Sequence, residues 1–434
     1  MMMSLVLLLT GFDLCVAAPR YPLKVSSNHR YLVDQDNRPF FLNGDAAWSL
    51  LSALTKDEAA RYLENRRALG FNTLIVNLVE HHFNGPANRT GDEPFTTPGD
   101  FSTPNEKYFA HADWVLHRAN EKGLLILLAP CYLGYKGLQE GWYDEIRASG
   151  IQKCRDYGRF VGRRYHDLPN IIWTMGGDRD PGDALEEVRE IARGIKEYDQ
   201  RNLFTAHCAP EESAADGYGG EAWLDVNTTY SYAIVHQKLM ADYRRQPPRP
   251  DFMIESTYEG EHNSTAVQIR RQAYWSPLCG AFGHVMGNKP IWLFDPGWEA
   301  ALRGTASLDM ARFAALFRSR AWHDLVPDEA HKIVTAGLGE ENGLDYATAA
   351  GTSDGATAII YLPTARPITV GKAVVTGAQA RAWWFDPRNG QARDAGLFAT
   401  DAAHEFIPPA GGDWVLVLDD ADKNFPTPGT SPAP

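Results

Sequence analysis

Short apolar runs rich in β-branched residues alternate with stretches of helical periodicity along most of the chain. Two of these runs are Thr73–Val79 (TLIVNLV) and Leu124–Ala129 (LLILLA), and a helical stretch at Asn105–Lys122 lies between them. Strands buried on both faces read as continuous apolar runs, and their regular alternation with helices indicates a parallel sheet. Eight such units fall between about residues 38 and 325. Eight units over that length fit a closed barrel better than an open sheet.

The remaining strands and helices of the predicted barrel follow the same alternation. Strands are predicted at Phe40–Gly44, Ile171–Met175, Leu203–Ala206, Asp225–Thr229, Phe252–Glu255 and Phe282–Met286. Helices are predicted at Thr55–Leu69, Ile151–Tyr165, Asp183–Tyr198 and Thr265–Tyr274. The glycine-rich GxGxxG turn of dinucleotide-binding folds follows none of the strands, which disfavours that class. The prediction is therefore an α/β protein with a (β/α)₈ barrel over residues 19–330.

Beyond about Val326 the pattern changes to short strands separated by Gly, Asp and Asn turns. Strands are predicted at Ala356–Leu362, Ala380–Phe385 and Trp414–Leu418, and the segment Asp386–Gly390 (DPRNG) is typical of a hairpin turn. These features predict a small all-β sandwich domain over residues 333–420. Residues 423–434 are rich in proline and predict a disordered tail.

The first 18 residues (MMMSLVLLLTGFDLCVAA) contain a short apolar run followed by small residues at Val16–Ala18. This order indicates a signal peptide cleaved after Ala18, and hence a secreted or periplasmic protein. Basic residues are missing before the run, and Asp13 lies just behind it. A start assigned too far upstream of a cytoplasmic enzyme therefore stays open as the alternative. No other stretch approaches the roughly 20 apolar residues of a membrane span.

The formal net charge of −13 bears on the partners that the chain can have. Such a surface repels phosphate backbones and anionic lipids, so nucleic acid and membrane surfaces are not expected as partners. The 12 tryptophans and 18 tyrosines suit the flat faces of sugar rings, although core packing uses aromatic residues as readily. A carbohydrate is therefore one partner class that the composition allows, and the oligomeric state stays open.

In a (β/α)₈ barrel the reactive groups lie at the C-terminal ends of the strands. The polar and aromatic residues near these ends are Asp45, Trp48, Asn77, Glu80, His81, His82, Tyr132, Tyr135, Asp178, Tyr230, Tyr232, Glu255 and His284. They include neither a nucleophilic Ser or Cys elbow nor the HExxH spacing of a zinc site. The widely spaced cysteines are expected to be buried free thiols, although an exported protein permits disulfides; they are Cys131, Cys154, Cys208 and Cys279. The prediction contains no metal and no cofactor.

Two carboxylates stand out among these residues. Asp178 follows Gly176–Gly177, which let the backbone turn sharply off its strand, and Glu255 ends the apolar run Phe252–Ile254. A carboxylate in such a place is unfavourable unless it is hydrogen-bonded or functional. Cleavage of a glycosidic bond needs two carboxyl groups on either side of the reacting carbon, and strands four and seven of a barrel can supply them. A structural role stays open for both, in which Asp178 caps the next helix or pairs with Arg179 and Glu255 forms an ion pair on the rim.

Five motifs, taken in order, resemble the apiosidase-like glycoside hydrolases, a group also known as DUF4038 that includes glycoside hydrolase family 140. The motifs are Asn43–Trp48 (NGDAAW), Gly70–Thr73 (GFNT), Ile172–Asp178 (IWTMGGD), Ile254–Gly260 (IESTYEG) and Gly287–Trp292 (GNKPIW). The resemblance spans nearly the whole chain after residue 18. It includes the β-domain, which in that group often carries a collagen-binding label.

The resemblance implies a retaining glycoside hydrolase that acts on plant or microbial glycans. It implies that Asp178 is the acid/base and Glu255 the nucleophile, and it favours a furanoside such as apiose or arabinofuranose as the substrate. The residues that it nominates for substrate binding are Asp45, Trp48, Asn77, His81, Tyr132, Tyr230, Tyr258 and Glu259. The alternative from a different class is a non-catalytic carbohydrate-binding protein that keeps the barrel as a recognition surface.

Overall fold

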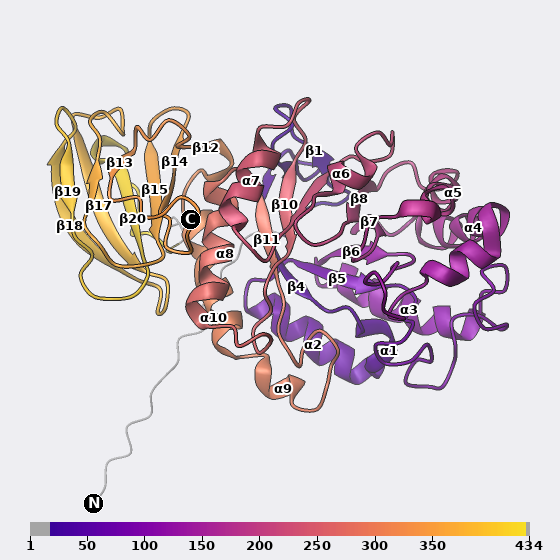
Figure 1. Cartoon of the computed structure of the whole chain (residues 1–434). Coiled ribbons are helices and arrows are strands. Elements are labelled where there is room, and N and C mark those ends of the chain that lie inside the picture. Colours follow the sequence, from indigo (N-terminus) through magenta and orange to yellow (C-terminus); the bar gives the residue numbers. More distant parts are fainter. Residues whose placement is uncertain (1–17, 431–434) are drawn as a thin grey trace, which may run out of the picture.

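The computed structural model describes residues 18–430, and in this part of the chain the expected barrel is present (Figure 1). Its eight parallel strands are β4 (Leu42–Ala46), β5 (Thr73–Asn77), β6 (Leu125–Ala129), β7 (Ile171–Gly176), β8 (Leu203–His207), β9 (Asn227–Tyr230), β10 (Asp251–Glu255) and β11 (Gly283–Met286). They follow the sheet order β8-β7-β6-β5-β4-β11-β10-β9. The fold prediction is confirmed. The predicted signal peptide lies outside the described residues, apart from Ala18.

Helices alternate with these strands and surround the barrel (Figure 1). They are α1 (Leu50–Ala53), α2 (Lys56–Ala68), α3 (Glu106–Glu121), α4 (Tyr143–Tyr165), α5 (Leu185–Lys196), α6 (Ala214–Tyr218), α7 (Val235–Tyr243), α8 (Ala266–Leu278), α9 (Trp298–Ala301) and α10 (Thr305–Arg318). Thr55 caps α2 in a reciprocal capping box with Glu58. Element α4 consists of two helical segments that meet at Gly150, whose backbone is non-helical (φ 73°), and the second segment begins at Ile151, as expected. Within residues 18–430, no helix combines the length and the apolarity that crossing a bilayer requires.

The barrel closes between β8 and β9, which are the two ends of the sheet order. Side chains carry much of this closure. The hydroxyl of Thr205 donates to the carbonyl of Val226 over 2.8 Å, and that of Thr228 donates to the carbonyl of Ala206 over 2.6 Å. The carboxylate of Asp225 accepts from the amide of Phe204 over 2.9 Å. Threonine hydroxyls thus replace part of the backbone ladder at this seam.

The C-terminal region is a sandwich of two antiparallel sheets. The larger has the order β12 (Leu325–Pro327), β14 (Thr348–Thr352), β15 (Thr357–Leu362), β20 (Trp414–Asp420), β17 (Gln379–Asp386) and β18 (Gln391–Ala399). The smaller has the order β13 (Val334–Ala336), β16 (Ile368–Val370) and β19 (His404–Phe406). Their facing side chains share one core that contains Ile360, Phe406 and Trp414. The predicted DPRNG turn joins β17 to β18. A third, small sheet before the barrel contains β1 (Lys24–Val25), β2 (Leu32–Val33) and β3 (Pro39–Phe40).

Buried ion pairs join the β-domain to the barrel, which it meets along α8 and α10 (Figure 1). Arg270 of α8 contacts both carboxylate oxygens of Asp413 at 2.7 and 2.8 Å, and Asp309 of α10 at 2.8 Å. Beside this cluster, the rings of Tyr274 and Tyr361 stack at 4.8 Å. Removing one partner of such a buried pair is strongly destabilising because the other charge is left unpaired. These contacts fix the β-domain against the barrel.

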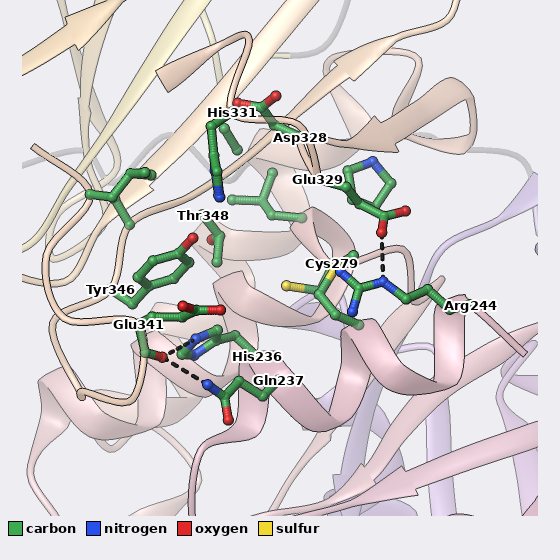
Figure 2. Close-up of a pocket in the computed structure, with 16 residues that line it drawn as sticks. His236, Gln237, Arg244, Cys279, Asp328, Glu329, His331, Glu341, Tyr346 and Thr348 are labelled. Carbon is green, nitrogen blue, oxygen red and sulfur yellow. Dashed lines mark hydrogen bonds and ion pairs between the residues drawn. The ribbon is translucent and has the colours of Figure 1, made fainter. Parts of the chain in front are cut away.

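A cavity of about 320 Å³ lies where α7 and α8 meet the β-domain (Figure 2). On its wall, His236 stacks on Tyr346 at 4.6 Å, and its Nε2 lies 3.0 Å from the carbonyl oxygen of Glu341. Arg244 forms an ion pair with Glu329 at 2.6 Å. Neither Asp178 nor Glu255 lines this cavity, so it is separate from the predicted carboxylate pair.

Residues 424–430 belong to the segment that was expected to be a disordered tail, and they lie against the body of the protein. The carbonyl of Pro426 accepts from Arg320 over 2.9 Å, and the amide of Gly429 donates to the hydroxyl of Ser319 over 3.1 Å. Arg320 also lies over the ring of Phe425 at 5.0 Å. The last residues, 431–434, lie outside the described part of the chain.

Candidate active site

A bulge in β10 decides which way the Glu255 side chain points. Asp251 pairs with Asn227 and Met253 with Thr229, but Glu255 then pairs with Tyr230, so Ile254 is the extra residue. The carboxylate of Asp251 lies on the outer face of the barrel, where it binds Asn227. Strict alternation would place Glu255 on that same outer face. The bulge reverses the alternation and turns Glu255 toward the interior, where the strand ends converge.

Two hydroxyl groups and one imidazole hold the Glu255 carboxylate. The hydroxyls of Tyr232 and Tyr230 lie 3.0 and 3.2 Å from Oε1, and Nε2 of His207 lies 3.0 Å from Oε2. The side chain keeps 11% of its surface exposed, so small molecules can still reach it. Among the described residues, its charged partner is the buried His207 and neither Lys nor Arg, so the ion pair considered for Glu255 lies inside the barrel instead of on the rim. The donors instead orient a carboxylate and stabilise its negative charge.

His207 is a residue of this site that the sequence reasoning missed. It ends β8 and is fully buried, and burial acts to lower its pKa. The hydrogen bond to Glu255 and the negative charges of Glu255 and Asp178 outweigh that effect and raise the pKa. Its imidazole also lies edge-on against the rings of Trp48 and Tyr230 at 5.4 and 5.1 Å. The available signal was its place directly after the apolar run Leu203–Ala206.

Two glycines bring Asp178 to the end of β7, as expected. Gly176 has φ 80°, and a Cβ atom there would lie 2.4 Å from the carbonyl oxygen of His207. A Cβ atom at Gly177 would lie 2.4 Å from the amide nitrogen of Leu133. Side chains at these positions would collide with backbone, which leaves glycine as the only residue that fits both.

The two structural roles considered for Asp178 are absent from the described structure. Arg179 lies over the ring of Tyr143 at 3.5 Å instead of pairing with Asp178. The next helical turn, η1 (Gly182–Ala184), begins at Pro181 without a side-chain cap. Oδ1 of Asp178 is buried without a hydrogen-bond partner among the described residues. One oxygen of this carboxyl is therefore uncommitted.

The environment of Asp178 raises its pKa to about 7. Burial is the largest cause, and the negative charge of Glu255 acts in the same direction. The charge of His207 and a hydrogen bond from Tyr230 act to lower the pKa and only partly offset this. Asp178 is therefore protonated in a large fraction of molecules near neutral pH. Such a carboxyl can donate a proton, whereas the donors around Glu255 favour a negative charge on that residue.

Aromatic residues enclose the two carboxyl groups. The indole nitrogen of Trp48 donates to the hydroxyl of Tyr258 over 3.0 Å, and the rings of Trp48 and Tyr132 lie 5.3 Å apart. Burial raises the pKa of Tyr132, and the charges of Asp178 and Glu255 raise it further, so Tyr132 lies near both carboxyls. Four predicted residues, Trp48, Tyr132, Tyr230 and Tyr258, are thus brought together.

Two further aromatic residues extend this wall and were not predicted. The ring of Phe83 lies 5.6 Å from that of Tyr132 and 5.2 Å from that of Trp292. Both residues are in loops that follow strands, Phe83 after β5 and Trp292 after β11. Apolar side chains beyond a strand end give no chemical signal in a sequence, which explains why they were missed.

Asp45 was predicted to bind the substrate, but the structure does not bring it together with Asp178 and Glu255. The residue is fully buried between β4 and α2, where it accepts hydrogen bonds from Tyr62 at 2.6 Å and Arg66 at 3.3 Å. Along β4, Leu42 and Ala46 pack in the cluster that contains the barrel interior. Alternation then places Asp45 on the outer face, under the helix layer.

Glu259 and His81 have structural partners outside the carboxylate pair. Oε1 of Glu259 accepts from the amide of Ala306 over 3.1 Å in the first turn of α10, a position where a negative charge stabilises a helix. Nε2 of His81 lies 2.8 Å from the carboxylate of Glu145, and its ring contacts Trp142. These two residues support the surrounding loops, and no described contact joins either to Asp178 or Glu255.

Asn77 lies at the predicted place, at the end of β5. Its backbone amide donates to the carbonyl oxygen of Trp48 over 3.0 Å, and its side chain is buried. Oδ1 lacks a hydrogen-bond partner among residues 18–430. Asn77 therefore supports the loop of Trp48 and keeps one acceptor unused.

The described thiols offer neither a nucleophile nor a metal ligand. All four are free and buried: Cys131, Cys154, Cys208 and Cys279. Burial raises the pKa of Cys154 to about 12 and also raises those of the other three. A buried thiol with a raised pKa is largely protonated and unreactive at neutral pH. In the part of the chain that the structure describes, three or more His, Cys, Asp or Glu side chains nowhere gather in a way that could hold a metal ion.

Two family models match consecutive parts of the chain. The model described as "Apiosidase-like, catalytic domain" matches residues 26–324, which contain all the residues of the site. The model described as "Putative collagen-binding domain of a collagenase" matches residues 326–419. A search of curated proteins gave no significant match. Neither model names glycoside hydrolase family 140, so that finer assignment stays a prediction.

Solved structures with the same architecture are glycoside hydrolases. One, described simply as a glycoside hydrolase, has 26% identity over 93% of this chain and 98% of its own, with a TM-score of 0.83. A family 5 glycoside hydrolase from Bacteroides vulgatus has 25% identity over 95% of this chain and 96% of its own, with a TM-score of 0.84. A family 5 mannosidase from Rhizomucor miehei, at 15% identity, covers 68% of this chain and 96% of its own with a TM-score of 0.50, and shares the fold alone.

Proposed function

The chain belongs to the apiosidase-like family of glycoside hydrolases, and from this premise we propose that it cleaves its substrate through Asp178 as acid/base and Glu255 as nucleophile. One observation carries the proposal. Two carboxyl groups at the ends of β7 and β10 have opposite environments, since the pKa of Asp178 is raised to about 7 while the Glu255 carboxylate lies against two tyrosine hydroxyls and an imidazole. Glycoside cleavage needs this division between a proton donor and an anion.

In the first step, an oxygen of Glu255 attacks the anomeric carbon of the sugar. The bond between that carbon and the leaving oxygen breaks, and its electron pair goes to the leaving oxygen. The proton of Asp178 moves to the same oxygen, so the leaving group departs as a neutral alcohol. The products of this step are a glycosyl ester on Glu255 and an ionised Asp178. Loss of the charge on Glu255 removes one of the causes that raise the pKa of Asp178.

In the second step, Asp178 acts as a base toward water. It takes one proton from the water molecule while the water oxygen bonds to the anomeric carbon, and the ester bond to Glu255 breaks. The sugar is released with its original anomeric configuration, because two displacements have occurred at the same carbon. Glu255 is a carboxylate again, and Asp178 is protonated again.

Tyr230 lies near both carboxyl groups. Its hydroxyl lies 3.2 Å from Oε1 of Glu255, and it acts to lower the pKa of Asp178. Retaining enzymes have carboxyls ~5–5.5 Å apart and inverting enzymes ~6.5–9.5 Å apart. The retaining outcome that we propose follows from the resemblance to the apiosidase-like family, and the stereochemical measurement described below tests it.

The substrate that we propose is a furanoside of the apiose or arabinofuranose type, within a plant or microbial glycan. The apiosidase-like family match supports this class, and the aromatic wall of Trp48, Tyr132 and Tyr258 can pack against a sugar ring. The apolar leader with its small-residue end supports a secreted or periplasmic location.

The test is a panel of 4-nitrophenyl glycosides, furanosides and pyranosides, together with pectic oligosaccharides, with products identified by mass spectrometry. We expect release of a single sugar from a furanoside, with retained configuration in an NMR time course of the first turnovers. Initial formation of the opposite anomer would replace the two-step mechanism by an inverting one. Binding of a sugar by wild-type protein without cleavage of any member of the panel would favour the non-catalytic alternative.

A further inference from the structure

Glu211, an exposed residue in the loop between β8 and α6, binds three consecutive residues after β9. Oε1 accepts from the amide of Tyr232 over 2.8 Å and from that of Ala233 over 3.0 Å. Oε2 accepts from the hydroxyl of Ser231 over 2.7 Å. Glu211 itself has φ 66°, an unfavourable conformation for a residue other than glycine. One carboxylate therefore organises the whole turn, at a backbone position that is itself strained.

The turn that Glu211 organises carries the phenol that donates to Glu255. The side chain of Tyr232 is 40% exposed, so burial alone does not fix its position. Its hydroxyl lies 3.0 Å from Oε1 of Glu255 and 2.8 Å from the hydroxyl of Tyr230. The backbone of Tyr232, held by Glu211, therefore sets where this hydroxyl lies.

The β8–α6 loop also spans the seam of the barrel at this point. An isolated bridge pairs Ser213 of the loop with Thr229 of β9. His207 at the end of β8 begins the loop, and it contacts the other oxygen of Glu255. The same loop thus leads from one donor of the Glu255 carboxylate, His207, to the anchor of another, Tyr232.

We propose that Glu211 is a positioning residue for the cleavage reaction, one that holds Tyr232 so that its hydroxyl donates to the nucleophile Glu255. The inference rests on the proposed function, because it assigns a role toward the nucleophile of that reaction. Glu211 acts through Tyr232 and touches neither the substrate nor the reacting atoms. A hydrogen bond to a charged group contributes roughly 1.5–3 kcal/mol, so losing its alignment lowers kcat by about tenfold or more.

The experiment compares Glu211→Ala, Glu211→Gln, Tyr232→Phe and the double variant Glu211→Ala/Tyr232→Phe on the 4-nitrophenyl glycoside that the wild type cleaves fastest. We expect Glu211→Ala to lower kcat by about tenfold with a much smaller change in KM. The double variant should be no slower than Tyr232→Phe, because both substitutions remove one and the same contact. Glu211→Gln keeps an oxygen that can accept from both amides, so it should recover most of the activity.

The matched control is Glu212→Ala, which removes the same charge from the neighbouring position. The carboxylate of Glu212 forms no hydrogen bond with another described residue, and the wild-type kcat is expected. Hydrogen exchange at the amides of Tyr232 and Ala233 provides a readout that needs no substrate. It should become faster in Glu211→Ala and stay unchanged in Glu212→Ala.

The positioning role would be overturned if the double variant lost kcat by the product of the two single losses. Unchanged kcat and unchanged hydrogen exchange in Glu211→Ala would overturn it as well. Failure of the proposed function looks different, because Glu255→Gln would then keep its activity, or the wild type would cleave no glycoside of the panel. In either case the exchange experiment still decides whether Glu211 holds the turn. Unchanged exchange in Glu211→Ala would overturn the inference there as well.

Discussion

The imidazole of His207 lies 3.0 Å from the carboxylate of Glu255, and this contact passes over β9 to join the ends of β8 and β10. Both residues are buried, and each influences the other electrostatically. The carboxylate raises the pKa of His207 against the effect of burial. In return, the imidazole orients the oxygen of Glu255 that does not contact the two tyrosines.

Substitution Glu255→Gln should abolish turnover and lower the pKa of His207. The amide cannot form a glycosyl ester, so kcat should fall by roughly a thousandfold or more. Without the charge of Glu255 less remains to offset the effect of burial on His207, so its protonated form is lost at a lower pH than in the wild type. NMR titration of the imidazole checks the second part independently of any substrate. An unchanged His207 titration would contradict the described contact.

Activity should decrease as the pH rises through about 7, because Asp178 must be protonated in order to donate. Its pKa is raised to about 7, so the donor form is depleted above that pH and kcat/KM falls with it. The Asp178→Asn variant should lack this basic limb. It should also lose most activity toward alkyl glycosides while keeping part of it toward 4-nitrophenyl glycosides, whose leaving group needs little protonation. An unchanged basic limb in Asp178→Asn would assign that titration to another group.

Substitution Gly177→Ala should lower both activity and stability. The added Cβ atom would lie 2.4 Å from the backbone nitrogen of Leu133, so the chain before Asp178 must move. Overpacking of this kind lowers the free energy of unfolding by roughly 1–3 kcal/mol. Gly220→Ala is the matched control, because open space surrounds that position. Urea denaturation and kcat measured on both variants check this, and equal behaviour of the two would refute the steric argument.

Substitution Arg270→Met should destabilise the whole protein in a single transition. It leaves Asp413 and Asp309 buried without their shared cation, and losing one partner of a buried pair lowers the free energy of unfolding by roughly 3–5 kcal/mol. Arg381→Met breaks an exposed pair with Asp394 and should lower it by less than about 1 kcal/mol. Urea unfolding followed by tryptophan fluorescence measures both. Two separate transitions, with the barrel unaffected, would show that the domains unfold independently.

The free energy of unfolding should decrease as the pH falls below about 6.5, in part because of His284. Burial lowers the pKa of this residue from 6.5 to about 3. Between these values the unfolded chain binds a proton that the folded chain does not, so acid favours unfolding. Above pH 6.5 the imidazole of His284 is neutral in both the folded and the unfolded chain, so it no longer makes the free energy of unfolding depend on pH. In His284→Leu the pH dependence between 6.5 and 4 should be weaker, as measured by urea denaturation. An equally steep dependence would exclude His284 as a cause.

The barrel could be predicted from the sequence because its strands are buried on both faces. Runs such as Leu124–Ala129 need no tertiary information to be recognised, and the strand-end rule then led to Asp178, Glu255 and Tyr230. The same rule would have found His207 if it had been applied to the fifth strand. The resemblance to a family assigned roles to the two carboxyls, which the pattern alone left open.

The direction of each side chain was harder to predict than its position along the chain. Asp45 was expected to bind the substrate, but it follows the alternation of β4 to the outer face, where Arg66 and Tyr62 bind it. Glu255 points inward only because of the bulge at Ile254, and nothing in the run Phe252–Glu255 announces an extra residue. A bulge depends on the neighbouring strand, so a sequence read one strand at a time does not reveal it.

Thr205 and Thr228 close the barrel where β8 meets β9. The contact between His207 and Glu255 therefore crosses the seam at which the ring of strands is closed. His207 ends β8 on one side of this seam, whereas Tyr230 ends β9 and Glu255 ends β10 on the other side. A larger separation of β8 from β9 would therefore lengthen the hydrogen bond between the imidazole and the carboxylate. The hydroxyls of two threonines on neighbouring strands thus help to hold His207 and Glu255 within hydrogen-bonding distance of each other.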